Sequence, residues 1–235
     1  MTTLALHYWA GSGREYEPLR ARLPGPLLAP DLPGFGAQPV PLGFDYSVAA
    51  YADWVAAYLA EQQLADFTLI GHSMGGKIAL ALAARRPAGL ARLVLLSPSP
   101  PTPEPIAEAD RRASLRAYGQ PAEAEKTCRH ITARPLAADQ HRQVVADNLR
   151  TTRAAWNAWL LRGAREDISA QLPRLTVPCH LLVGAADRAI TPATQRQQTL
   201  PLLPAGTPLT VVPGTGHLLP LEAPAAVAAA CLAAG

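Results

Sequence analysis

Short apolar runs recur along the chain and alternate with segments whose apolar residues repeat at helical spacing. Six such runs predict strands near residues 4–8, 27–30, 67–70, 93–96, 177–183 and 209–212. Between two of them, residues 48–59 repeat apolar side chains three or four positions apart, after a serine that can cap a helix. Strands that alternate with helices favour parallel pairing with helices on both faces. The pattern therefore predicts an α/β fold with a mostly or wholly parallel sheet of about six strands.

The pattern changes in the middle of the chain. Beyond residue 100 prolines cluster, charged residues become denser, and no run typical of a strand appears. Helical spacing predicts short helices at 109–117 and 122–131 and a longer one at 139–161. We therefore expect an α/β core made of residues 1–99 and 175–235. Residues 100–174 would form a helical cap, inserted after the fourth strand and lying over the edge where ligands bind in open parallel sheets.

Composition narrows the classes of function. The net charge of +3 is small and scattered, and no basic block indicates a nucleic acid partner. The sequence has no apolar run of the length that a transmembrane helix needs, and its first residues resemble a strand more than a signal peptide. Its three cysteines are widely separated, which favours free thiols in a reducing compartment. We expect a cytoplasmic protein that binds neither membranes nor metals.

The residues around Ser73 carry the first chemical signal. A strand ends at Gly71, Ser73 follows, and Gly75 and Gly76 begin an alanine-rich helix. A G-x-S-x-G sequence between a strand and a helix predicts a sharp, strained turn that exposes the serine hydroxyl. The positive end of the helix dipole there favours developing negative charge. Because glycine and serine also meet in ordinary turns, this signal needs support from the rest of the chain.

Two further residues supply that support. Asp187 and His217 each follow the C-terminal end of another predicted strand, so a parallel sheet brings both to the same edge as Ser73. A serine needs a neighbouring base, histidine titrates in the required range, and a carboxylate orients the imidazole. Asp187 could instead cap the helix that follows it, and His217 could be an ordinary loop residue. We nevertheless predict a catalytic Ser73–His217–Asp187 triad.

Acyl transfer also requires amides that stabilise an oxyanion. The residue after the nucleophile, Met74, is expected to provide one N–H group. The loop after the first strand is expected to provide the other, from Trp9. In this scheme the enzyme needs neither a metal nor an organic cofactor.

The chain resembles the α/β-hydrolase-fold proteins over nearly its whole length, and the order Ser, Asp, His is the order of that fold. The matching segments are residues 7–12 (HYWAGS), 31–36 (DLPGFG), 71–76 (GHSMGG), 184–187 (GAAD) and 216–224 (GHLLPLEAP). The resemblance implies an α/β-hydrolase fold with a helical cap. Two features depart from the family. Tyr8 stands where members commonly carry glycine after His7, and the sequence begins almost on the first parallel strand, so we expect no hairpin before it in this sheet.

Several other residues allow two interpretations. Trp156 and Trp159 follow helical spacing that is typical of a core, yet beneath a cap the same face can contact substrate, and Leu218 beside the histidine can do so too. We include these three as candidate substrate contacts. His7 and His72 are expected to pack, Asp31 to shape its turn, and Lys77 to be solvated or paired.

The sequence thus predicts a serine hydrolase, in the simplest case a carboxylesterase for small or medium acyl groups. A thioesterase, a C–C bond hydrolase and a cofactor-free perhydrolase or acyltransferase could use the same triad. A hydrolase-like protein that binds a ligand with little turnover is the alternative from another class. The partner would be a small ester-like molecule, and the protein would be a monomer or homodimer.

Overall fold

The computed structural model describes residues 1–233 and contains one six-stranded sheet. The strand order is β2-β1-β3-β4-β5-β6, and every pair of neighbours is parallel. The strands are β1 (Thr2–Leu6), β2 (Leu27–Leu28), β3 (Phe67–His72), β4 (Leu90–Leu96), β5 (Cys179–Gly184) and β6 (Leu209–Val212). The predicted parallel sheet of six strands is confirmed.

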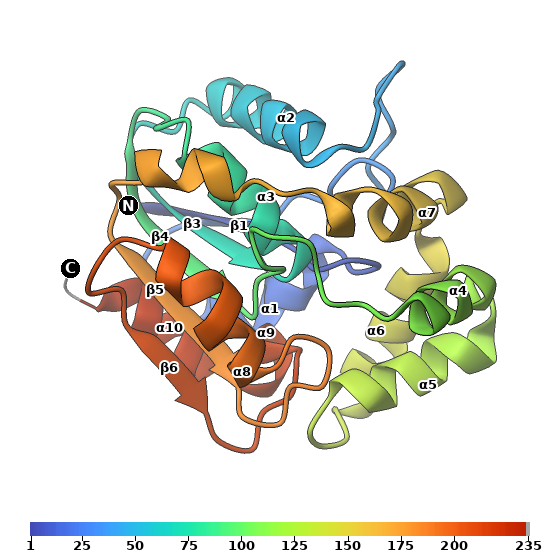
Figure 1. Cartoon of the computed structure of the whole chain (residues 1–235). Helices are drawn as coiled ribbons and strands as arrows, with labels where there is room; N and C mark the ends of the chain where they lie inside the picture. Colours follow the sequence, from blue (N-terminus) through green and yellow to red (C-terminus); the bar gives the residue numbers. More distant parts are fainter. Residues whose placement is uncertain (234–235) are drawn as a thin grey trace.

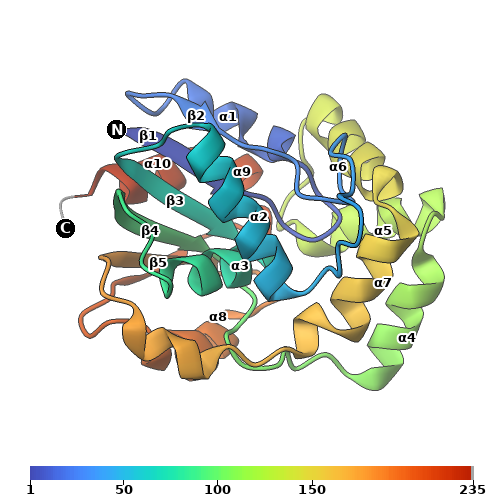
Figure 2. The ribbon, with the colours of Figure 1, turned by 90° about the horizontal axis from the view of Figure 1, so that it is seen from above.

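Helices cover both faces of this sheet, as Figure 2 shows. Alternate residues of the central strands explain this arrangement, because successive side chains point to opposite faces. Leu69 packs with the helices of one face, whereas its neighbour Ile70 packs with those of the other. The first face carries α2 (Val48–Glu61) and α3 (Met74–Ala83); the second carries α1 (Glu17–Arg20), α9 (Leu219–Glu222) and α10 (Pro224–Leu232).

Four α-helices lie between β4 and β5 in the chain, and Figure 1 shows them together on one side of the molecule. They are α4 (Glu108–Ala117), α5 (Pro121–Ile131), α6 (Ala138–Arg150) and α7 (Arg153–Leu161). The expected single helix over 139–161 is wrong. The backbone is extended at Thr151 and Thr152, the Thr152 hydroxyl accepts from the Ala155 amide to cap α7, and the Thr152 amide donates to the Gly34 carbonyl. Below, "the cap" means α4–α7.

The segment between β5 and β6 also departs from expectation. From Thr191 followed by Pro192, the sequence predicts one helix running through Leu200. The structure has only short pieces there: α8 (Pro192–Thr194), a five-residue π-helix (Gln195–Thr199) and a 3₁₀ turn (Leu200–Leu202). Gln195 is fully buried in the π-helical piece, and its side-chain amide donates to the Pro98 carbonyl at 2.8 Å. The π-helical turn thus occurs where a polar side chain is buried and hydrogen-bonded to another segment of the chain.

The cap is fastened to the loop after β1. Asp147 of α6 is buried; it accepts from the Ser12 hydroxyl at 2.7 Å and pairs with the Arg14 guanidinium. Buried charges are stable only when they are paired, so this contact fixes α6 above the loop that carries Trp9. Within residues 1–233, no helix has the length and apolar character needed to cross a membrane.

Candidate active site

Ser73 occupies a strained turn between β3 and α3. Its φ of 52° and ψ of −117° lie in a region that residues with a Cβ rarely adopt. The turn is possible because glycines surround it: a Cβ on Gly75 would lie 2.4 Å from the Leu6 carbonyl oxygen, and one on Gly71 would lie 2.7 Å from the Ala79 side chain. The predicted sharp turn at Ser73 is therefore present.

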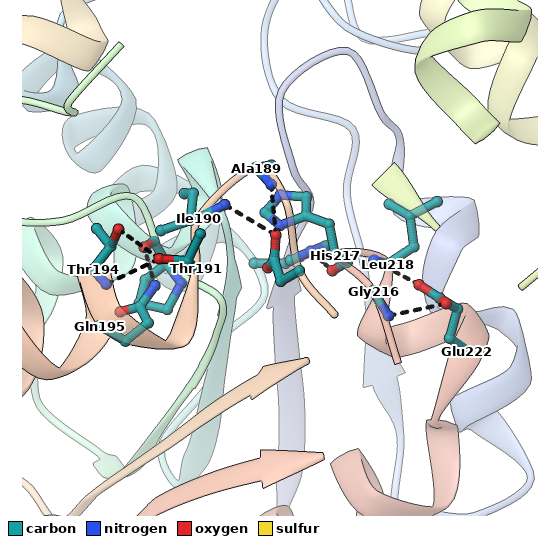
Figure 3. Close-up of polar contacts among 12 residues, drawn as sticks. Ala189, Ile190, Thr191, Thr194, Gln195, Gly216, His217, Leu218 and Glu222 are labelled. Atoms are coloured by element: carbon teal, nitrogen blue, oxygen red, sulfur yellow. Dashed lines mark hydrogen bonds and ion pairs between the residues drawn. The ribbon is translucent and has the colours of Figure 1, made fainter. Parts of the chain in front are cut away.

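Asp187 and His217 meet through a direct hydrogen bond. His217 Nδ1 donates to Asp187 Oδ2 at 2.8 Å, and both residues are almost completely buried. The other carboxylate oxygen accepts from the Ala189 and Ile190 amides, at 2.8 and 2.9 Å, and Figure 3 shows these two amides beside His217. Because the carboxylate only accepts, Nδ1 carries the proton and Nε2 keeps its lone pair.

Burial alone would lower the pKa of His217, but the negative charge and hydrogen bond of Asp187 outweigh it, and the pKa is raised. Burial alone would raise the pKa of Asp187, but His217 and the Ile190 amide reverse this, so its pKa is lowered. The pair therefore stabilises an imidazolium next to a carboxylate, which is the charge distribution that a histidine base needs after it takes a proton.

The backbone of His217 is held from three sides. His72 Nε2 donates to its carbonyl at 2.8 Å, and its amide donates to the Ile131 carbonyl of α5 at 2.7 Å. Glu222 accepts from the amides on either side of the histidine, those of Gly216 and Leu218, at 3.0 and 3.2 Å (Figure 3). These contacts fix the imidazole relative to both the sheet and the cap.

Ser73 and His217 line the same pocket beneath the cap, with a volume of about 310 Å³. Trp9, Trp159 and Tyr8 also line it. Of the three candidate substrate contacts, Trp159 therefore lines the pocket, whereas Trp156 and Leu218 do not. Trp156 is buried, and its indole N–H donates to the Ser114 carbonyl at 3.0 Å; Leu218 is fully buried beside Tyr8 and α5.

The two proposed oxyanion donors, Met74 and Trp9, lie directly after Ser73 and in the loop after β1. Met74 is the first residue of α3, so its amide has no carbonyl one turn earlier within the helix. Trp9 follows β1, lines the pocket, and packs on Trp156 with ring centroids 4.2 Å apart. Tyr8, the departure from the family pattern, also lines the pocket and packs with Cys128 and Leu218. The role of the two amides stays a prediction.

Some residues of the site had no role in the sequence-based prediction. Glu104 and Asp110 line the pocket; the sequence distinguished neither of them from the other charged residues that follow residue 100. Burial raises the pKa of Glu104, partly opposed by the Ser99 hydroxyl and by the positive charge of Lys77. Glu15 is buried against His72 at 2.9 Å, 57 residues away in the chain. Pairings over such separations leave no local sequence pattern.

Lys77 differs from its expected solvated or paired state. Its side chain is fully buried, and Nζ donates to the carbonyls of Thr102 and Glu166. Thr102 precedes the cap in the chain and Glu166 follows it. The ammonium group of Lys77 therefore hydrogen-bonds to both of the segments that connect the cap to the sheet. Burial lowers the pKa of Lys77 to about 8.

The other polar residues lie as expected. His7 is buried, and its Nε2 accepts from the Leu32 amide at 2.9 Å. Asp31 accepts from the Gly13 and Ala37 amides, at 2.8 and 2.7 Å, and so shapes the adjoining loops. Among residues 1–233, no group of three or more His, Cys, Asp or Glu side chains has the arrangement of a metal site.

Comparison with known proteins identifies the family and agrees with the fold. The chain is 31% identical over 244 residues to 2-succinyl-6-hydroxy-2,4-cyclohexadiene-1-carboxylate synthase of Enterobacter sp. (strain 638), a match covering 97% of this chain and 88% of that protein. A thermophilic esterase from Thermogutta terrifontis, solved with malate bound, superposes with a TM-score of 0.79 at 26% identity, covering 97% of this chain and 86% of that one.

An esterase from Exiguobacterium antarcticum gives a TM-score of 0.86 at 19% identity, with 97% of this chain and 89% of that one covered, a likeness of fold. Residues 5–230 match the model of the alpha/beta hydrolase family. With that match, the parallel sheet and the turn at Ser73, the chain belongs to the alpha/beta hydrolase family and is a hydrolase.

Proposed function

We propose that the protein is a serine carboxylesterase. Ser73 attacks the ester carbonyl while His217 Nε2 takes the hydroxyl proton, and Asp187 stabilises the imidazolium that results. The Met74 and Trp9 amides bind the oxyanion. His217 then returns its proton to the leaving alcohol. Water, activated by the same histidine, hydrolyses the acyl-enzyme and restores Ser73.

The hydrogen bond between His217 and Asp187 carries this proposal. It fixes the tautomer that leaves Nε2 unprotonated, and the ring lines the same pocket as Ser73. A structural histidine in a loop has no need for a buried carboxylate that is itself held by two backbone amides. The arrangement therefore supports proton transfer at Ser73 more than ligand binding alone.

The pocket favours uncharged acyl groups. Its lining contains two acidic residues, Glu104 and Asp110, and neither lysine nor arginine. Apolar side chains, among them Ile106, Trp159 and Leu160, make up much of the remaining wall. A carboxylate on the substrate would lose water without gaining a lysine or arginine partner, which is costly in such surroundings. We propose neutral esters with small to medium acyl groups as substrates.

A second candidate comes from the full-length match to the 2-succinyl-6-hydroxy-2,4-cyclohexadiene-1-carboxylate synthase. The name of that relative's product contains a succinyl group and a ring carboxylate. A product of this kind would favour lysine or arginine in the pocket, and the lining contains neither; its basic side chains are His130 and His217. The coverage of the match favours this activity, and the charge of the pocket favours the esterase.

Hydrolysis of p-nitrophenyl esters of increasing acyl length tests the proposal. Wild-type protein should release p-nitrophenol from the acetate and butyrate esters, and Ser73→Ala should lower kcat by at least about 10³-fold. Ser114→Ala is the matched control, because Ser114 lines the same pocket away from the turn. A fluorophosphonate should label Ser73. Equal turnover by Ser73→Ala, or ligand binding without labelling, would overturn the esterase.

A further inference from the structure

A second group of nucleophile, imidazole and carboxylate lies in the cap. Cys128 of α5 lines the active-site pocket, and its Sγ lies 3.5 Å from Nδ1 of His141 in α6. The other ring nitrogen, Nε2, lies 2.6 Å from Glu125 Oε2. Glu125 and Cys128 are three residues apart on one helix, so both side chains face α6.

The hydrogen bonds fix the direction of proton transfer. A carboxylate can only accept, so His141 Nε2 carries the proton that Glu125 binds. In the neutral ring, Nδ1 then has a free lone pair, and that atom is the one next to the thiol. The thiol therefore donates to a base that is already oriented. The same logic applies to Asp187 and His217 around Ser73.

The surroundings of the thiol explain why it needs this base. Cys128 is only 1% exposed, and burial raises the pKa of its thiol to about 11. The charges of Glu125 and Glu222 act in the same direction, whereas Arg129 opposes them. The sulfur is therefore protonated at neutral pH, and it becomes a strong nucleophile only while a base removes its proton.

We propose that Cys128 is a reactive modification site in the wall of the pocket, at which His141 acts as base and Glu125 positions it. Its substrates are small carbon electrophiles that enter the pocket, such as haloacetamides. Sulfur forms a bond to carbon, the halide leaves with the bonding electrons, and the thiol proton passes to His141 Nδ1. The imidazolium is stabilised by Glu125 and loses its proton to water, because His141 is partly exposed.

This inference goes beyond the proposed esterase and stands without it. An adduct on Cys128 would project into the pocket that contains Ser73, because both residues line it. Modification would therefore also block ester hydrolysis. The adduct itself is detected by mass, so a failure of the esterase proposal leaves the test of Cys128 intact.

The experiment measures alkylation of each cysteine by iodoacetamide at pH 7, using mass spectrometry of proteolytic peptides. Cys179 and Cys231 serve as internal controls, because both are buried, neither lines the pocket, and burial raises the pKa of each to about 12. In native protein, Cys128 should react at least about 10-fold faster than either. The Ser73→Ala variant should give the same rates.

Variants of the two partners test the mechanism. His141→Ala should slow alkylation of Cys128 by about 10²-fold, the usual contribution of a general base, and added imidazole should restore part of the rate. Glu125→Gln should slow it less. Glu123→Gln is the matched control, because Glu123 lies on the same helix and pairs with Lys126.

Slow labelling of Cys179 and Cys231 in every variant shows that the fold is intact. Cys128 reacting no faster than those two in wild-type protein would overturn the proposal. It would also be overturned if Cys128 in the His141→Ala variant were alkylated at the wild-type rate or faster. The same holds if added imidazole did not raise the alkylation rate of that variant while its fold remained intact.

Discussion

His72 Nε2 donates a hydrogen bond to the carbonyl oxygen of His217 at 2.8 Å. The neighbour of the nucleophile thus holds the residue proposed as its base, across 145 positions of sequence. The other nitrogen of His72 faces the buried Glu15 carboxyl group at 2.9 Å. Two oxygen atoms therefore flank the ring, which requires either a doubly protonated imidazole or a protonated Glu15.

Replacing His72 tests whether this contact positions His217. His72→Ala should lower kcat for ester hydrolysis by about 10-fold or more with little change in KM, because the pocket wall stays in place while the base loses a support. His72→Gln keeps an N–H group near the same position and should recover much of the rate. Steady-state kinetics with p-nitrophenyl butyrate measure both.

Stability provides the control for this pair. His72→Ala leaves Glu15 buried without its partner, which should cost roughly 3–5 kcal/mol in the free energy of unfolding. Glu15→Gln can donate from its amide to the ring and should cost less. His180→Ala alters a histidine of β5 outside the pocket and should leave kcat unchanged. A His72→Ala enzyme with full kcat would contradict the positioning role.

The pair of Asp187 and His217 sets the pH dependence. Since the pKa of His217 is raised above 6.5, the base becomes protonated while the pH is still above that value. The acid limb of the kcat/KM profile should therefore lie above pH 6.5. Asp187→Asn removes the charge that raises this pKa, so its acid limb should move to lower pH while kcat falls by about 10⁴-fold. If the acid limb of the Asp187→Asn profile stayed at the wild-type pH, a group other than His217 would be responsible for it.

Glu104 should select against anionic esters. In Glu104→Gln the pocket loses one acidic group, so kcat/KM for a hemisuccinate ester should rise by about 10-fold relative to the butyrate ester of the same alcohol. The ratio of the two specificity constants is the measurement. Glu108→Gln, on the exposed start of α4 and outside the lining, should leave that ratio unchanged. An unchanged ratio in Glu104→Gln would mean that its charge does not reach the acyl group.

Lys77 should make the free energy of unfolding vary with pH in the alkaline range. Its pKa is about 8 in the folded protein and about 10.5 when unfolded, so between these values the unfolded chain binds more protons. Folding is therefore favoured as the pH rises from 8 to 10.5. Compared with Lys77→Met, wild-type protein should gain stability across that window. Urea unfolding at pH 7.5, 9 and 10 measures the difference, and parallel curves would contradict the lowered pKa.

The sequence determined the parallel sheet and the turn at Ser73, because both depend on local patterns. Alternating apolar runs and helical spacing define the order of elements, and glycine at 71 and 75 is needed wherever backbone approaches so closely. The two central candidates, Asp187 and His217, could be found because each follows a strand. The helix break at Thr151 and Thr152 could not be found in this way, since it is supported by a hydrogen bond from the Thr152 amide to the distant Gly34 carbonyl.

Tertiary structure decided what surrounds those residues. Glu15 and His72, Lys77 and Glu166, and the cap side chains in the pocket meet only after the chain has folded. Their positions depend on packing between elements far apart in sequence, which leaves no periodic signal. The order of residues along the chain thus determined which side chains could react. Only the packing of the folded chain decided which groups hold those side chains and which charged groups line their pocket.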